Sequence, residues 1–123
     1  MTEARAPGIG IDLIEIERVE RALERRPGLE RRLFRAGEIE YSRSSARPGK
    51  HFAARFAAKE AALKALGETV APRDIEVVGS APPRLLLHGR AAESAARAGL
   101  RLDVSLTHSR ELAGAVVTAT RAG

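Results

Sequence analysis

The sequence has no cysteine and few aromatic residues, which make up only 3% of the chain. Without cysteine, the chain can form neither a disulfide framework nor a thiolate metal site. The shortage of aromatic residues argues against a single-stranded nucleic-acid binder, because such proteins stack bases on aromatic rings. Long apolar runs are also missing, so neither a membrane span nor a signal peptide is predicted. We therefore expect a soluble, cytoplasmic protein with no membrane partner.

Acidic residues are outnumbered by basic ones. The 123 residues carry a net charge of +5, and the sequence pI is about 10.6. A surplus of this sign favours an anionic partner such as nucleic acid, a phosphorylated ligand or an acidic protein. The length suits a single domain over residues 1–123. A small basic nucleic-acid-binding module is therefore one hypothesis to keep beside an enzyme.

The spacing of apolar residues predicts an α+β domain with the element order β-α-α-β-β-α-β-β, in which the short helix over residues 29–34 is not counted. We expect an antiparallel sheet packed around one long, largely buried helix, and a loop over residues 42–50. Gly67 is the expected C-terminal cap of the long helix. The predicted helices cover 16–26, 29–34, 50–66 and 90–98, and the predicted strands cover 8–16, 74–78, 84–88, 101–109 and 112–120.

The long helix, "FAARFAAKEAALKALG" (52–67), is apolar on both sides yet carries four charges. Bulky residues gather on one side and alanines on the other, so another backbone can approach the alanine side closely. A helix of this kind is normally buried. Glu60 and Lys64 lie one turn apart between the two sides. They fit either a structural ion pair or a cation ligand beside a phosphate-binding group. Lys59 is expected to snorkel or to pair, and not to act in catalysis.

Asp12 interrupts the otherwise apolar strand "GIGIDLIEI". An unpaired carboxylate in such a strand is expensive to bury, so a partner is expected. Gly10, two residues earlier, is interpreted as leaving open space beside this carboxylate. Two carboxylates without histidine or cysteine suit Mg²⁺, which prefers oxygen ligands and shares its shell with substrate phosphates. Asp12 and Glu60 are therefore candidate magnesium ligands, and they would also suit a magnesium-dependent phosphohydrolase.

The helix predicted over residues 16–26 carries an apolar stripe, a glutamate stripe and an arginine stripe. The arginine stripe consists of Arg18, Arg21 and Arg25. This pattern fits either a solvated surface helix with internal Glu–Arg pairs or a docking face for an acidic partner.

Four segments occur in a specific order: "GIGIDLIEIERV", "FAARFAAKEAALKALG", "DIEV" and "DVSLTHS". Through them, residues 8–119 closely resemble the holo-(acyl-carrier-protein) synthases, the small trimeric bacterial type of phosphopantetheinyl transferase. The resemblance implies the phosphopantetheinyl transferase fold and a homotrimer with sites between subunits. It also implies Mg²⁺-dependent transfer of the 4′-phosphopantetheine group of coenzyme A to a serine of apo-acyl carrier protein. Adenosine 3′,5′-bisphosphate would be the by-product.

The same resemblance implies roles for single residues. Asp12 and Glu60 match the metal-binding carboxylates, and Glu60 is also the suggested general base, through a metal-held water. Lys64 matches a lysine that would stabilise the departing phosphate. Arg55 and His108 match coenzyme A phosphate ligands, with His108 serving a neighbouring subunit. Their alternatives are an ion pair for Arg55 and a structural role for His108.

The resemblance also implies that the helix over residues 16–26 docks an acidic helix of the carrier protein. Arg18 matches an arginine used there, and Arg21 and Arg25 match more loosely. Two features depart from the family pattern: the loop over residues 68–73 is short, and Asp103 stands before "VSLTH". Asp103 is either a neutral replacement or an additional acidic group near the site.

Overall fold

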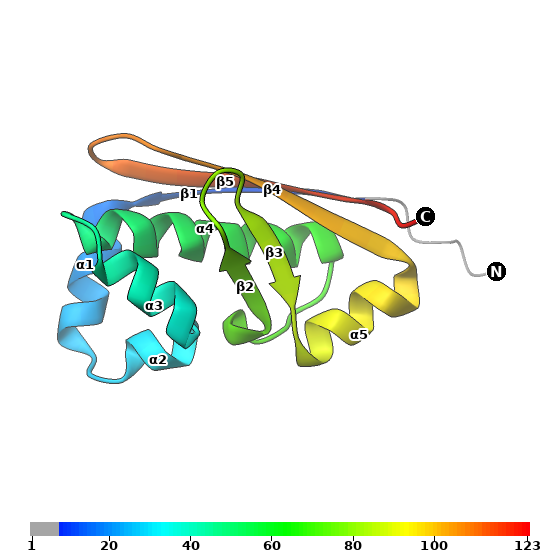
Figure 1. Cartoon of the computed structure of the whole chain (residues 1–123), viewed down its shortest axis with the longest axis horizontal. Coiled ribbons are helices and arrows are strands. Elements are labelled where there is room, and N and C mark those ends of the chain that lie inside the picture. Colours follow the sequence, from blue (N-terminus) through cyan, green and yellow to red (C-terminus); the bar gives the residue numbers. More distant parts are fainter. Residues whose placement is uncertain (1–7) are drawn as a thin grey trace.

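The computed structural model of the protein describes residues 8–123 and confirms the α+β class (Figure 1). Its elements are β1 (Ile9–Glu15), α1 (Ile16–Arg25), α2 (Leu29–Leu33), α3 (Ala36–Arg43), α4 (Pro48–Leu66), a 3₁₀ turn (Pro72–Asp74), β2 (Ile75–Val78), β3 (Arg84–Leu87), α5 (Gly89–Ala98), β4 (Leu100–His108) and β5 (Leu112–Arg121). The long helix begins two residues earlier than predicted because Pro48, whose φ suits a first helical position, starts it. It ends as predicted at Gly67, which has a left-handed φ of 72°.

The strands divide into two antiparallel sheets. One has the order β1-β5-β4, and β2 pairs with β3 in a separate hairpin. Figure 1 shows α4 lying beneath the three-stranded sheet, with α1, α3, the hairpin and α5 on its other side. The long helix is therefore the central layer, and 12 of its 19 residues are buried. Within residues 8–123, no helix is both long enough and apolar enough to cross a membrane.

Strand β1 lies directly against the alanine side of α4. A Cβ atom built on Gly10 would lie 1.9 Å from the carbonyl oxygen of Ala61, and one on Gly8 would lie 2.4 Å from that of Ala65. The expectation that the alanine side admits another backbone is confirmed. The interpretation of Gly10 as leaving open space beside Asp12 is wrong, since the backbone of α4 fills that space.

The alternation of side chains along β1 turns its bulky apolar residues outward. Ile9, Ile11 and Leu13 are 69%, 69% and 66% exposed, and we call these three residues the outer stripe. Gly10 on the opposite face is buried, and Asp12 and Ile14 are half-buried. The chain thus presents an apolar strip on its surface along the edge strand of the sheet.

Lys59 forms a buried ion pair with Glu38 of α3. Its Nζ donates to Glu38 Oε1 at 2.9 Å and to the carbonyl oxygen of Pro72 at 3.0 Å, while the amide of Val77 donates to Glu38 Oε2 at 3.0 Å. Burial lowers the pKa of Lys59, and the Glu38 carboxylate partly offsets this effect. The pairing predicted for Lys59 is confirmed, and it joins α3, α4 and the β2–β3 hairpin.

Replacing Gly10 by alanine should lower the free energy of unfolding by about 1–3 kcal/mol or more, because its Cβ would force β1 away from α4. Urea unfolding followed by circular dichroism measures the change. Gly37→Ala in α3 is the matched control. A Cβ there meets only Glu76 Oε2, at an ordinary 3.5 Å, and alanine favours a helix over glycine by about 0.5–1 kcal/mol. Wild-type stability in Gly10→Ala would contradict the close approach.

Candidate functional site

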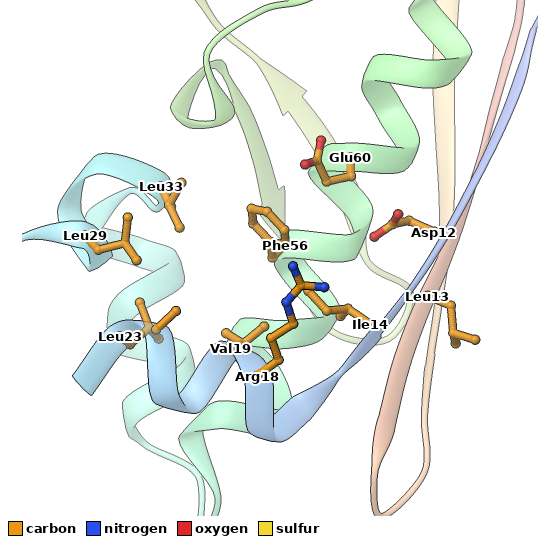
Figure 2. A pocket seen from close by; sticks show the side chains of 11 residues that line it. Asp12, Leu13, Ile14, Arg18, Val19, Leu23, Leu29, Leu33, Phe56 and Glu60 are labelled. Carbon is orange, nitrogen blue, oxygen red and sulfur yellow. The ribbon is translucent and has the colours of Figure 1, made fainter. Parts of the chain in front are cut away.

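A cavity of about 490 Å³ opens between β1, α1, α2 and α4. Asp12 of β1 and Glu60 of α4 both line it, and Figure 2 shows their carboxylates facing the same space. Arg18 of α1 extends its guanidinium into the cavity beside them. The structure therefore brings together two carboxylates that lie 48 positions apart in the sequence. The spacing of Asp12 and Glu60 in the sequence does not by itself establish that their carboxylates lie close together.

Lys64 is held next to Asp12. Its Nζ donates to the carbonyl oxygen of Ile11 at 2.8 Å and to Asp12 Oδ1 at 3.4 Å. The predicted alternative of a Glu60–Lys64 ion pair is not formed, because Lys64 turns toward β1 instead. Lys64 is 56% exposed, so its ammonium group remains accessible for an anion beside the two carboxylates.

The donor set fits a magnesium ion. Asp12 and Glu60 offer oxygen ligands only, and they do so at a cavity large enough for water and substrate oxygens. Within residues 8–123, no group of three or more His, Cys, Asp or Glu side chains converges to hold a metal. A site with two protein carboxylates suits Mg²⁺, which keeps several waters and binds substrate phosphates. It does not suit structural zinc, which takes four protein ligands.

The opposite wall of this cavity is apolar, and sequence reasoning missed it. Val19 and Leu23 of α1, Leu29 and Leu33 of α2, and Phe56 of α4 form the wall (Figure 2). The apolar stripe on α1 predicts a face packed on the core, and this pattern by itself does not indicate a cavity. The half-buried state of Leu23, Leu29 and Leu33 shows that these side chains border a cavity as well as the core.

The arginine stripe on α1 is divided by the structure. Arg18 lines the cavity, whereas Arg21 pairs with Glu17 one turn earlier, so the solvated-helix interpretation holds for Arg21. Arg25 is exposed in the last turn. The glutamate stripe helps to anchor the helix, because both carboxylate oxygens of Glu20 accept hydrogen bonds from the Arg47 guanidinium at 3.1 Å.

A second cavity, of about 330 Å³, brings Arg55 and His108 together. Arg55 is only 3% exposed, its guanidinium lies over the Tyr41 ring at 4.1 Å, and its buried Nε has no hydrogen-bond partner. The alternative prediction, an ion pair between Arg55 and a neighbouring carboxylate, is wrong, because Arg55 packs on the Tyr41 ring instead. Burial lowers the pKa of Arg55, while nearby Tyr41 and Glu38 partly offset the effect. Arginine nevertheless stays charged in proteins.

The two cavities share no lining residue. Arg55 and Glu60 are five positions apart on α4, which turns their side chains about 140° from each other around the helix axis. Within one chain, the Asp12–Glu60 pair and the Arg55–His108 pair therefore face different sides of α4.

The two departures from the family pattern lie outside both cavities. Asp103 is exposed and pairs with Arg101 at 3.3 Å. In the short loop after α4, the carboxylate of Glu68 accepts a hydrogen bond from Ser94 of α5. Asp103 is therefore not an additional acidic group in either candidate site.

The sequence relationships agree with this geometry. The family model described as the 4′-phosphopantetheinyl transferase superfamily matches residues 8–117. The chain belongs to this superfamily. The resemblance found in the sequence motifs is thereby confirmed, and so is the expectation that this phosphopantetheinyl transferase is an enzyme.

Relatives of this transferase carry a consistent name. The holo-[acyl-carrier-protein] synthase of Moorella thermoacetica is 44% identical over 113 residues, which cover 87% of this chain and 88% of that protein. The solved acyl carrier protein synthase of Mycobacterium tuberculosis is 34% identical, with a TM-score of 0.77 and coverage of 93% of this chain and 96% of that one. The holo-(acyl-carrier-protein) synthase of Bacillus anthracis, solved in complex with CoA (3′,5′-ADP), is 31% identical, with a TM-score of 0.77 and coverage of 94% and 96%.

Proposed function

We propose that this chain, as a single domain, is a holo-(acyl-carrier-protein) synthase. It transfers the 4′-phosphopantetheine group of coenzyme A to a serine of apo-acyl carrier protein and releases adenosine 3′,5′-bisphosphate. The observation that carries the proposal is the convergence of Asp12 and Glu60 on one cavity, with Lys64 held against Asp12. The names of its relatives and the coenzyme A complex of the Bacillus anthracis protein support it.

In the proposed reaction, the serine oxygen attacks the phosphorus atom nearest the pantetheine arm. The bond from that phosphorus to the bridging oxygen breaks, and the bridging oxygen leaves with the adenosine bisphosphate. Asp12 and Glu60 would hold Mg²⁺, which neutralises negative charge on the diphosphate oxygens when bound. Glu60 accepts the proton of the serine hydroxyl, and Lys64 donates to the leaving phosphate. Arg18 lines the same cavity beside the carboxylates, where its charge would orient the acidic carrier protein toward them.

Asp12→Asn or Glu60→Gln should lower the rate of transfer by a factor of about 10³ or more, because each variant removes one of the two carboxylates that would hold the metal. The measurement is the mass shift of apo-acyl carrier protein incubated with coenzyme A and Mg²⁺, with circular dichroism as the check of folding. Near-normal transfer by either variant would exclude the shared site. Release of adenosine bisphosphate without carrier protein would favour the phosphohydrolase alternative instead.

The proposal includes a homotrimer whose sites lie between adjacent subunits. Two observations support it. The outer stripe leaves three large apolar residues on the surface, as expected of a face that packs on another chain. The two cavities face different sides of α4, so one coenzyme A can contact both residue pairs if neighbouring subunits each supply one pair.

Co-expression of the Glu60→Gln and Arg55→Met chains tests the shared site. Each variant alone should be nearly inactive. In mixed trimers, about a quarter of the sites would combine an intact Glu60 from one subunit with an intact Arg55 from the next, so about a quarter of wild-type activity should return. Glu60→Gln co-expressed with Asp12→Asn is the matched control, because both residues line the same cavity of one chain. Equal activity of the two mixtures would contradict a site between subunits.

We also propose that α1 docks the acyl carrier protein through Arg18, with Arg21 and Arg25 as weaker contributors. Arg18 lies in the cavity that would hold the reacting phosphate, and Arg25 is exposed on the same helix. Arg21 already pairs with Glu17, which reduces its availability. Contacts between opposite charges at a protein interface act mainly on encounter and orientation, and salt weakens them.

Arg18→Glu should raise the KM for the carrier protein about fivefold or more at low salt and leave coenzyme A binding nearly unchanged, because the reversed charge repels an acidic partner. Steady-state kinetics with varied carrier protein, repeated at increasing salt, measures the effect. Arg97→Glu on α5 is the control, since it changes the net charge equally on an exposed residue of another helix. An unaltered KM in Arg18→Glu would show that α1 is a solvated surface.

A further inference from the structure

His51 belongs to the cavity that contains Arg55 and His108. It lies one turn before Arg55 on α4, so the two side chains share one face of the helix. The His51 ring meets the Tyr41 ring edge-on at a centroid distance of 5.3 Å and the His108 ring at 5.9 Å. Three separate parts of the chain, α3, α4 and β4, thus direct polar side chains into the same space.

Three polar groups of this cavity have no hydrogen-bond partner in the part of the chain that the structure describes: the His51 ring, the His108 ring and the Arg55 Nε. His88 shows the contrast, because its Nε2 lies 2.8 Å from Glu76 Oε1. The unpaired Nε of Arg55 is buried, and such a group is costly and is usually completed by water or a ligand. His51 is half-buried and His108 is exposed, so both rings are open to a ligand that enters the cavity. The cavity therefore has capacity for hydrogen bonds that the chain itself does not use.

The charge of the cavity specifies the kind of ligand. Its lining contains a guanidinium and two imidazoles but no carboxylate; its members are Tyr41, His51, Ala54, Arg55, Gly79, Ser80, Pro83, Leu106, Thr107 and His108. Guanidinium and imidazolium groups are strong donors to phosphate oxygens. A phosphate in this space would satisfy donors that are otherwise unpaired.

We propose that His51 is a further ligand for a phosphate group of coenzyme A and that it takes up a proton when the coenzyme binds. This inference rests on the proposed function and adds to it a residue and a dependence on pH. His51 contacts the substrate and takes no part in bond breaking.

The neighbours of His51 determine the direction of the pH effect. The charged and titratable groups facing it are Lys50 and Arg55 on α4, Tyr41 on α3 and His108 on β4, while the β2–β3 turn contributes Gly79, Ser80 and Pro83 to the cavity. Burial lowers the pKa of His51, and the positive charges of Arg55, His108 and Lys50 lower it further. In the free protein at neutral pH, His51 is therefore mostly neutral.

A bound phosphate reverses this balance. Its negative charge favours the protonated imidazole, so the pKa of His51 is higher in the complex than in the free protein. A complex that holds a proton more tightly is stabilised as the pH falls, so His51 should contribute more to coenzyme A binding at pH 6 than at pH 8. The phosphate itself also titrates near pH 6, and the cationic site favours its dianion, so its contribution has the opposite sign. The contribution of His51 is therefore read from the difference between wild type and the His51 variants at each pH.

Isothermal titration calorimetry of the full-length protein with coenzyme A tests the inference. His51→Gln keeps a hydrogen-bonding side chain without the titratable group, and His51→Phe removes both. Both variants should weaken binding about tenfold at pH 6 and about twofold or less at pH 8, because the charge-assisted bond exists only when His51 is protonated. Titrations in two buffers of different ionisation enthalpy should show wild type taking up about half a proton or more near pH 7, and the variants less.

Two controls separate the possible results. His88→Gln removes a histidine outside the cavity and should leave the pH dependence unchanged. Dephospho-coenzyme A identifies the phosphate: the His51 effect disappears with this ligand if His51 binds the 3′-phosphate and persists if it binds the diphosphate.

The role of His51 alone would be overturned if both His51 variants keep wild-type affinity and proton uptake while Arg55→Met weakens binding. Unchanged binding in Arg55→Met as well would overturn the placement of coenzyme A in this cavity.

Discussion

The structure depends on the close contact between the backbones of β1 and α4. Glycine on the strand and alanine on the helix let the two backbones approach closely, and a Cβ atom at Gly10 would collide with the carbonyl of Ala61. This contact sets the height of Asp12 above the helix and lets Lys64 reach the carbonyl oxygen of Ile11 at 2.8 Å. A bulkier residue at either position would separate the two carboxylates. The small residues in both motifs therefore serve the geometry of the site.

A second constraint fixes the other side of α4. The buried Lys59–Glu38 pair connects the helix to α3 and to β2, and its carboxylate also receives the amide of Val77. Removing one partner of such a pair leaves an uncompensated buried charge, which costs about 3–5 kcal/mol. The helix is thus held by close backbone contact on one side and by a charged network on the other. Both cavities open along a rigid element, which favours precise positioning of their side chains.

Sequence reasoning found most of the elements because apolar periodicity and glycine caps are local signals. It also selected Asp12 and Glu60, since a carboxylate in an apolar setting is conspicuous. It could not show that they meet, because β1 and α4 are distant in the chain, and it misjudged Gly10 for the same reason. The second cavity escaped notice because its lining comes from α3, α4, the β2–β3 turn and β4. For His51, the sequence offers only one local indication of a place in this cavity, namely its position one helical turn before Arg55.

The contrast between the lysines has a consequence for chemical labelling. All three lysines of the chain, Lys50, Lys59 and Lys64, lie on α4. Lys59 is 1% exposed and ion-paired, so amine-reactive reagents should spare it in the folded protein. The reagents would instead modify the accessible Lys64 beside Asp12, and the half-buried Lys50 less readily. Modification at Lys64 would block the candidate site, whereas the loss of Lys64 labelling on adding a ligand would serve as a footprint of that site.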